Sequence, residues 1–232
     1  FETQILFGHK ICKMLKATTL KVYMNQMTAE QRYLFDLQGY LVLKNIIPRE
    51  TIETINNLMT LLEGSPKESL PNGVTHGKLR SPEELYLANI VEADPIFHQF
   101  IDHEKIIPII KETTLGLYRL NHVYAIYRWG KGYTYMHMQN NPMHPKCTYH
   151  CQHGEIFSLC TKVVFPILNH RREDGCFAAI PGSHKANFRN PWGIHPDENP
   201  PLIPIDANPG DAIVFTEALT HGSFESKCEQ LL

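Results

Sequence analysis

The sequence predicts an α+β chain whose second half forms an all-β sandwich or barrel, with a jelly roll as the best single expectation. Up to Gly116 the apolar residues recur mainly at helical offsets. After Gly116, short runs of β-branched and aromatic residues follow one another, separated by turns such as Asn208-Pro209-Gly210-Asp211. Helices followed by many turn-bounded strands define this class.

Length and composition predict one domain. The chain has 232 residues, of which 43% are hydrophobic, enough to bury one substantial core. We expect a single domain over 27–232, preceded by a weakly structured N-terminal extension over 1–26. The formal net charge of −2 and the lack of a basic run exclude the charge pattern of a nucleic-acid-binding protein.

The apolar stretches of the sequence are too short for membrane-spanning helices. No apolar stretch approaches the roughly 20 residues of a membrane span. Residues 1–16 lack the ordered charged and apolar regions of a signal peptide. A chain with its own core does not need its six cysteines as disulfides, so we expect reduced thiols and a cytoplasmic or other reducing compartment.

The first elements have clear local signals. A capping-box pattern at Thr28-Ala29-Glu30-Gln31 predicts a helix to about Leu37, ended by Gly39. Residues 40–43, Tyr-Leu-Val-Leu, favour a strand. An amphipathic helix is predicted from Pro48 to Gly64.

The next stretch is rich in glycine and proline. We expect a loop over 64–82 that covers the mouth of a pocket. Three short helices should follow over 82–90, 95–101 and 104–114, each with a proline tolerated in its first turn.

The second half is predicted to be strands. Residues 120–127 and 133–137 should pair across the turn that holds Gly130 and Gly132. Further strands are expected at 156–168, 176–180, 202–205 and 212–215.

Two histidines are candidate metal ligands: His137, at the end of the run 133–137, and His221, in the segment 219–223. A jelly roll brings residues that are distant in sequence to one end of the barrel, where two imidazoles and a carboxylate would form a facial triad that leaves iron open to a co-substrate and O2. On spacing alone the pattern is weak, because the chain has 13 histidines and a histidine near a strand end is more often a plain surface residue.

Several ordered motifs give a firmer basis. Residues 175–185, Gly-Cys-Phe-Ala-Ala-Ile-Pro-Gly-Ser-His-Lys, together with 208–212, 219–223 and the opening segment 35–43, resemble the phytanoyl-CoA dioxygenase family. The resemblance covers about Met27 to Ser223. It implies a double-stranded β-helix, a cupin-like jelly roll with N-terminal flanking helices, that binds Fe(II) and 2-oxoglutarate. It also implies hydroxylation of a small organic or lipid-like substrate with O2.

The resemblance also implies the metal ligands. The family commonly uses His-x-Asp followed by a distal histidine, and these positions fall on His137 and His221. Gln139 stands where the Asp is expected and would be a neutral, weaker third ligand. Halogenation, which uses a small residue at that position, ranks below hydroxylation because Gln139 is not small.

The co-substrate site is incomplete by the same comparison. Ser223 is expected to hydrogen-bond the distal carboxylate of 2-oxoglutarate. The arginine that the family places about one strand beyond the distal histidine is not found in 225–232, and Lys227 cannot form a bidentate fork. The resemblance therefore implies a chain truncated at its C-terminus with the last barrel strand missing. A catalytically inactive dioxygenase-like binding or scaffold protein is the alternative.

Other features of the sequence allow different interpretations. The cluster His144, Cys147, His150, Cys151 and His153 could hold zinc, but we favour a solvent-facing loop because no second pair of ligands is evident. His153-Gly154-Glu155 has the pattern of a turn. His184 is expected in a structural turn rather than as a ligand. Residues 190–196 could line the pocket entrance or simply cross the surface, and the oligomeric state stays open.

Overall fold

The computed structural model describes residues 26–77, 83–138 and 148–227. Within these ranges all the strands are antiparallel and fall into three three-stranded sheets and one hairpin. The first sheet contains β1 (Tyr40–Leu43), β10 (Ala212–Thr216) and β7 (Thr161–Val164), in that order. The second contains β11 (His221–Ser223), β8 (Phe177–Ala179) and β9 (Ile203–Pro204).

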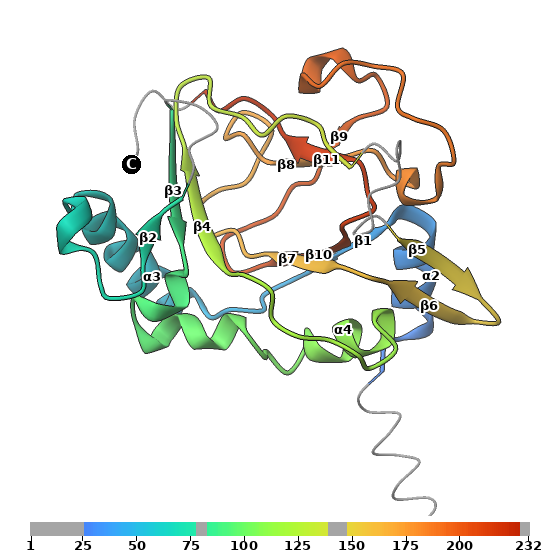
Figure 1. Ribbon diagram of the computed structural model, residues 1–232, viewed down its shortest axis with the longest axis horizontal. Coiled ribbons are helices and arrows are strands. Elements are labelled where there is room, and N and C mark those ends of the chain that lie inside the picture. Colours follow the sequence, from blue (N-terminus) through green and yellow to red (C-terminus); the bar gives the residue numbers. More distant parts are fainter. Residues whose placement is uncertain (1–25, 78–82, 139–147, 228–232) are drawn as a thin grey trace, which may run out of the picture.

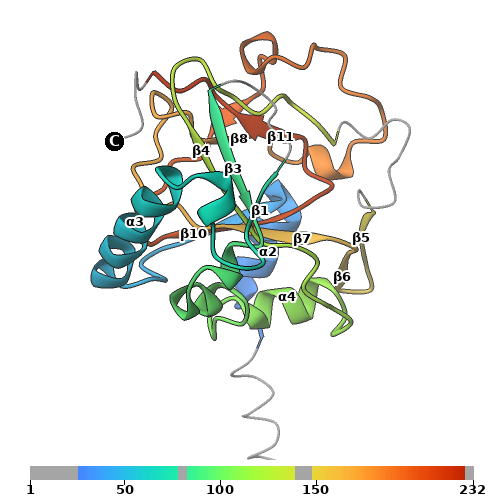
Figure 2. The ribbon, with the colours of Figure 1, turned by 60° about the vertical axis from the view of Figure 1, so that its left-hand side comes forward.

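The other strands form a third sheet and a hairpin. The third sheet holds β2 (Thr75–His76), β3 (Glu84–Ala88) and β4 (Tyr124–Arg128), and the hairpin holds β5 (Tyr149–Gln152) and β6 (Glu155–Ser158). Figure 1 shows β8 and β11 above β7 and β10, with helices below, and Figure 2 shows the same order of layers after a turn. Among the described residues the sheets do not close into one hydrogen-bonded barrel.

The helix α2 (Ala29–Gln38) begins and ends where its local signals place it. The Thr28 hydroxyl accepts from the Gln31 N–H and the Gln31 side chain accepts from the Thr28 N–H, so the predicted capping box is present. Gly39 ends the helix in the left-handed region, with φ 87°. The chain then enters β1 directly, as predicted.

The remaining helices are short except one. The 15-residue α3 (Arg49–Glu63) buries Ile52, Ile55, Met59 and Leu62 along one face. The helix α4 (Ile107–Thr113) has seven residues. Single turns of 3₁₀-helix lie at η1 (Lys67–Ser69), η2 (Ile90–Glu92), η5 (Ser183–Lys185) and η6 (Pro196–Glu198), and a longer one at η3 (Pro95–Phe100). In the described part no helix is long and apolar enough to span a membrane.

The core lies on both faces of β10. Val214 and Ala212 pack into the cluster that contains Phe35 of α2 and Ile109 of α4. The alternate residues Ile213 and Phe215 pack with Phe177 and Ala179 of β8, so this second cluster fills the space between the two sheets. A sheet buried on both faces explains why β10 is a continuous run of apolar residues.

One predicted helix is wrong. Of the segment 82–90, residues 84–88 form the strand β3. Leu85 and Leu87 point into the cluster under α3 while Glu84 and Tyr86 alternate with them, and β3 pairs along its length with β4. The proline and the leucine and alanine content suggested a helix, but a period of two and a partner strand decided the outcome.

Two strand predictions also need correction. The expected pairing of 120–127 with 133–137 is wrong, because β4 pairs with β3 and the segment 133–137 lies along β11 instead. The long strand 156–168 is divided into β6 and β7, since β6 pairs with β5 and β7 pairs with β10. The chain changes partner at Leu159 and Cys160, whose sequence carries no turn signal.

Candidate metal centre

The two histidines singled out from the sequence lie opposite each other on neighbouring backbone segments. The His137 N–H donates to the His221 carbonyl at 3.0 Å, and the His221 N–H donates to the His137 carbonyl at 3.3 Å. Opposite residues of an antiparallel pair project from the same face. Their ring centroids are accordingly only 4.1 Å apart.

Each of the two rings is oriented by an equivalent hydrogen bond, from its Nδ1 to the backbone carbonyl two residues earlier. The Nδ1 of His137 lies 2.9 Å from the Tyr135 carbonyl, and the Nδ1 of His221 lies 2.6 Å from the Leu219 carbonyl. A carbonyl can only accept, so Nδ1 carries the hydrogen and Nε2 carries the lone pair in each neutral imidazole. Metal-binding histidines are commonly held in this way by the nitrogen that does not bind the metal.

The spacing of the rings fits a shared metal ion. Bonds of about 2.1 Å from one metal to two imidazole nitrogens at right angles place the ring centroids about 4.5 Å apart. The observed 4.1 Å is close to this value. Imidazole is a ligand suited to iron among other transition metals. The two histidines therefore fit two of the three positions of a facial triad.

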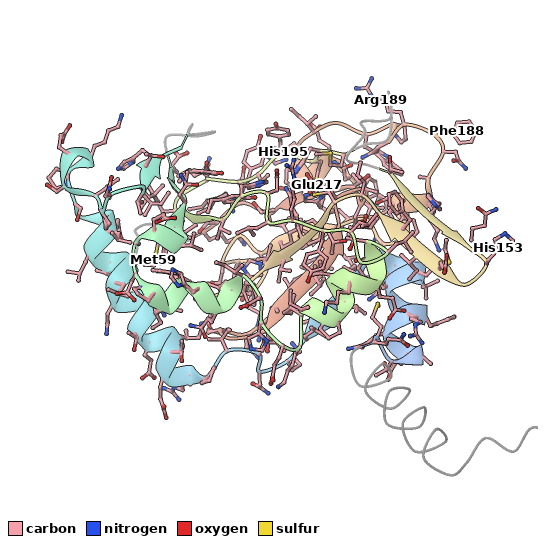
Figure 3. The ribbon with its side chains drawn as sticks, turned by 60° about the horizontal axis from the view of Figure 1, so that its bottom comes forward. Met59, His153, Phe188, Arg189, His195 and Glu217 are labelled. Carbon is pink, nitrogen blue, oxygen red and sulfur yellow. The ribbon has the colours of Figure 1, made fainter. Side chains whose placement is uncertain are left out.

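The third ligand is not found among the described residues. Gln139, expected at this position, lies outside them. Within 26–77, 83–138 and 148–227 no group of three or more His, Cys, Asp or Glu side chains could hold a metal ion. The carboxylate of Glu217 is buried near β7, and it lies 2.9 Å from the Lys162 ammonium (Figure 3).

Aromatic rings flank the histidine pair. The Phe215 ring centroid lies 4.8 Å from that of His221, and the Phe177 centroid lies 5.5 Å from it. The Tyr135 ring lies 5.6 Å from His137. His221 is only 4% exposed. Phe177 and Phe215 therefore keep water from the His221 side of the pair and strengthen electrostatic interactions there.

The turn at residues 180–185 holds the residue that precedes His221. The Thr220 N–H donates to the Ser183 hydroxyl at 2.8 Å, and the Thr220 carbonyl accepts from the Ile180 N–H. His184 of η5 occupies the structural turn expected for it, with its Nε2 3.0 Å from the Asp36 carbonyl. Burial lowers the pKa of His184 to about 4, so it is neutral at physiological pH.

Ser223 lies two residues beyond His221 on the same strand and is buried. Its hydroxyl accepts from the Thr134 N–H at 2.8 Å, and its own N–H donates to the Thr134 carbonyl at 3.0 Å. Ser223 and His221 therefore share the face of β11 that the aromatic rings line. This position is compatible with the co-substrate contact expected from the sequence.

The zinc alternative gains no support. His144 and Cys147 lie outside the described residues, and His150, Cys151 and His153 are exposed on the hairpin formed by β5 and β6. His153 and Gly154 form its turn, with φ 54° and 82°. Figure 3 shows His153 at the tip of this hairpin, far from the centre of the molecule.

The loop 190–196 lies against the segment that carries His137. The Met136 N–H donates to the Ile194 carbonyl at 2.8 Å, and the rings of Tyr133 and His195 are 4.8 Å apart. Trp192 and Ile194 are 41% and 58% exposed, so the loop presents apolar side chains to solvent beside the site. Its position favours the interpretation as part of an entrance over a remote surface crossover.

A charged residue close to this site was missed in the sequence. Arg128, at the end of β4, has its Nε 3.1 Å from the Glu84 carboxylate and its Nη2 hydrogen-bonded to the Thr134 hydroxyl. Its side chain is 17% exposed and that of Glu84 is fully buried. Because Ala125 and Tyr127 face α3, alternation along the strand was the signal that could have placed Arg128 on the other face.

The antiparallel layers and the histidine pair fit the non-haem oxygenase fold that the sequence motifs predicted. A comparison with known families matches residues 35–230 to the family described as phytanoyl-CoA dioxygenase. The chain belongs to this family, as its motifs predicted. No curated protein matches the sequence significantly.

Solved structures with the same fold include enzymes crystallised with 2-oxoglutarate. HygX from Streptomyces hygroscopicus with nickel and 2-oxoglutarate bound is 21% identical over 88% of this chain and 83% of its own, with a TM-score of 0.73. EctD from S. alaskensis with 2-oxoglutarate and 5-hydroxyectoine is 17% identical over 87% and 72%, with a TM-score of 0.62. The alpha ketoglutarate dependent epimerase SnoN is 12% identical over 90% and 79%, with a TM-score of 0.61.

These similarities confirm the predicted fold class. The chain shares the double-stranded β-helix fold with these proteins. The family and the fold are those of non-haem oxygenases that use iron and 2-oxoglutarate, in agreement with the cofactors predicted from the sequence. HygX has been crystallised with hygromycin B and EctD with 5-hydroxyectoine, so the fold leaves the substrate of this chain open.

Proposed function

We propose that this protein is an Fe(II)- and 2-oxoglutarate-dependent dioxygenase that hydroxylates a small organic or lipid-like substrate with O2. The observation that carries the proposal is the pair His137 and His221, whose rings lie 4.1 Å apart with both Nδ1 atoms held by backbone carbonyls. Two imidazoles oriented alike at this spacing are two thirds of a facial triad.

The roles of the chain's own residues follow from their positions. His137 and His221 would bind the metal through Nε2, and Gln139 is proposed as a third contact. Bound Fe(II) with 2-oxoglutarate and O2 supplies the oxidising chemistry, in which 2-oxoglutarate becomes succinate and CO2. Phe177 and Phe215 keep water away from the site, and the Ser223 hydroxyl orients the co-substrate.

A catalytically inactive binding protein is the second candidate. One observation favours it: in the described part of the chain, no carboxylate or thiolate completes a three-ligand group with the histidine pair. An amide in place of a carboxylate weakens metal binding because it donates less charge. Such a protein would keep the double-stranded β-helix and bind a small molecule without turnover.

The first test is an anaerobic titration with Fe(II), with and without 2-oxoglutarate, that monitors the visible metal-to-ligand charge-transfer band. We expect the band in the unmodified chain and its loss in His137→Ala and in His221→Ala. His153→Ala is the matched control, because this histidine is exposed at a hairpin tip, and its band should be unchanged. No band in the unmodified chain would favour the inactive binding protein.

The cellular compartment remains a proposal. Cys176 is a buried free thiol, and Cys151 is an exposed one. An exposed free thiol fits the reducing compartment that we propose, because disulfides accumulate where the environment is oxidising. Labelling the intact protein with a thiol reagent in cells and counting the reacted cysteines by mass would test it.

A further inference from the structure

We propose that Arg128 is the side chain that binds the distal carboxylate of 2-oxoglutarate, together with the hydroxyls of Thr134 and Ser223. The inference rests on the proposed function, because it names the residue that anchors the co-substrate. Arg128 lies far from Ser223 in the sequence and close to it in the fold.

The face of β4 that carries Arg128 is fixed by its neighbours. Val123, Ala125 and Tyr127 pack into the cluster under α3, so alternate residues point to the opposite side of the sheet. Arg128 is directly opposite Glu84 of β3 in the strand register. Its guanidinium reaches the segment 133–137, which joins β4 to the candidate metal centre.

A continuous series of hydrogen bonds links Arg128 to the strand that carries His221. The Arg128 Nη2 donates to the Thr134 hydroxyl. The Thr134 N–H then donates to the Ser223 hydroxyl at 2.8 Å. Ser223 is two residues from His221 on β11, so the series ends on the strand that carries one of the proposed metal ligands. Thr134 and Ser223 are 6% and 4% exposed.

The directions of these bonds favour an anion as the next partner. A hydroxyl has one hydrogen to donate as well as lone pairs that accept. The Thr134 oxygen accepts from the guanidinium and the Ser223 oxygen accepts from a backbone N–H. The hydrogen of each hydroxyl is therefore the donor that a neighbouring acceptor would use. Two hydroxyl donors beside a guanidinium form a pattern that matches a carboxylate.

Glu84 holds the guanidinium in place. Its fully buried carboxylate lies 3.1 Å from the Arg128 Nε and so fixes one edge of the planar group. Burial, together with the charges of Arg128 and Arg171, lowers the pKa of the nearby His170 to about 4, so this histidine is neutral at physiological pH. Because Glu84 shares the charge of Arg128, we expect the guanidinium to add about 10- to 100-fold to co-substrate affinity and not more.

The test compares two 2-oxo acids, 2-oxoglutarate and 2-oxobutyrate, which lacks the distal carboxylate. Binding is measured anaerobically by the Fe(II) charge-transfer band and by calorimetry on the protein loaded with Ni(II), which does not turn over. The main variants are Arg128→Gln and Arg128→Lys. The double variant Arg128→Gln/Glu84→Gln removes both charges, so that no buried carboxylate loses its partner and folding is preserved.

A surface pair provides the matched control. Arg49 and Glu53 form an exposed ion pair one helical turn apart, with the Arg49 side chain 91% exposed. The double variant Arg49→Gln/Glu53→Gln therefore makes the same chemical change away from the site. Near-ultraviolet circular dichroism and direct Ni(II) affinity report whether each variant keeps its fold and its metal site.

The expected result is that the Arg128 variants lose the preference for 2-oxoglutarate over 2-oxobutyrate and keep their metal affinity. The unmodified chain and the surface control should bind 2-oxoglutarate about 10- to 100-fold more tightly than 2-oxobutyrate. The Arg128→Gln and double variants should bind both acids equally, with unchanged Ni(II) affinity, and Arg128→Lys should recover part of the preference. If the Arg128 variants keep the full preference, the inference is overturned while the proposed function stands. If the unmodified chain binds metal and neither acid, or binds no metal, both are overturned.

Discussion

His137 and His221 are joined by two reciprocal backbone hydrogen bonds, with N···O distances of 3.0 and 3.3 Å. These bonds hold the two imidazoles on one face, where their ring centroids are 4.1 Å apart. The geometry of the candidate metal centre therefore depends on how closely the segment 133–137 approaches β11, and this approach can be tested directly.

Gly222 permits that approach. A Cβ atom at this position would lie 2.6 Å from the Thr134 carbonyl oxygen and 3.0 Å from the Met136 sulfur. We expect Gly222→Ala to push the two segments apart and to weaken Ni(II) or Fe(II) binding by at least about 10-fold, since ligand geometry sets metal affinity. Calorimetric titration with Ni(II) measures the effect.

Gly64→Ala is the control for this substitution. Gly64 has φ −74°, and the nearest atom to an added Cβ is 3.8 Å away, so the variant should bind metal as the unmodified chain does. Equal metal affinity in Gly222→Ala and Gly64→Ala would show that the close approach is not needed for the site.

The effects of substituting Lys162 and Glu217 on the free energy of unfolding should depend strongly on each other. The two charged atoms are 2.9 Å apart, and the side chains are 22% and 2% exposed. Lys162→Met leaves a carboxylate buried without its cation, which we expect to cost up to about 3 kcal/mol. The double variant Lys162→Met/Glu217→Leu should recover most of that loss. Urea unfolding of both variants measures the difference, and equal stabilities would argue against the coupling.

Stability should fall on mild acidification because of His184. Burial lowers its pKa from 6.5 to about 4 in the folded protein, so between these values the unfolded chain binds more protons than the folded one. The unfolded state is then favoured as the pH falls, by about 1.4 kcal/mol per pH unit within this window. Above pH 6.5 the histidine is neutral in both states and has no such effect.

Urea unfolding at pH 7.5, 6 and 5 measures this dependence. His184→Gln removes the titrating group and should flatten the profile, while His153→Gln, at an exposed turn, should leave it unchanged. Asp211 acts in a lower window, since its depressed pKa lies below its ordinary 3.8. The same slope in His184→Gln and in the unmodified chain would rule out this assignment.

The capping box of α2 gives a prediction for stability alone. Thr28→Ala removes the acceptor of the Gln31 N–H, at 3.1 Å, and should destabilise the protein by about 1 kcal/mol. Thr28→Ser keeps the acceptor and should cost much less. Chemical unfolding measures both, and metal affinity should be the same in the two variants.

Much of the N-terminal half could be predicted because its signals are local. The capping box, Gly39 and the apolar face of α3 determine where α2, β1 and α3 begin and end, and the structure confirms these elements. The motif around 175–185 similarly predicted the turn that holds His184. In each case the residues that determine the element are within a few positions of it.

The errors arose where distant residues decide the local structure. Residues 84–88 form a strand because β4 offers a partner, and 156–168 is divided because its two halves pair with β5 and β10. The sequence of these segments alone is compatible with a helix in the first case and with one continuous strand in the second.

The sequence by itself determined the family, the order of elements around α2 and α3, and the two histidines to examine. The tertiary structure decided which nitrogen of each imidazole is directed away from the backbone, and it placed Arg128 within two hydrogen bonds of Ser223. The reason is physical. Hydrogen bonds between strands join residues by register and not by sequence separation, so charges that share a buried site become neighbours only after the sheets have formed.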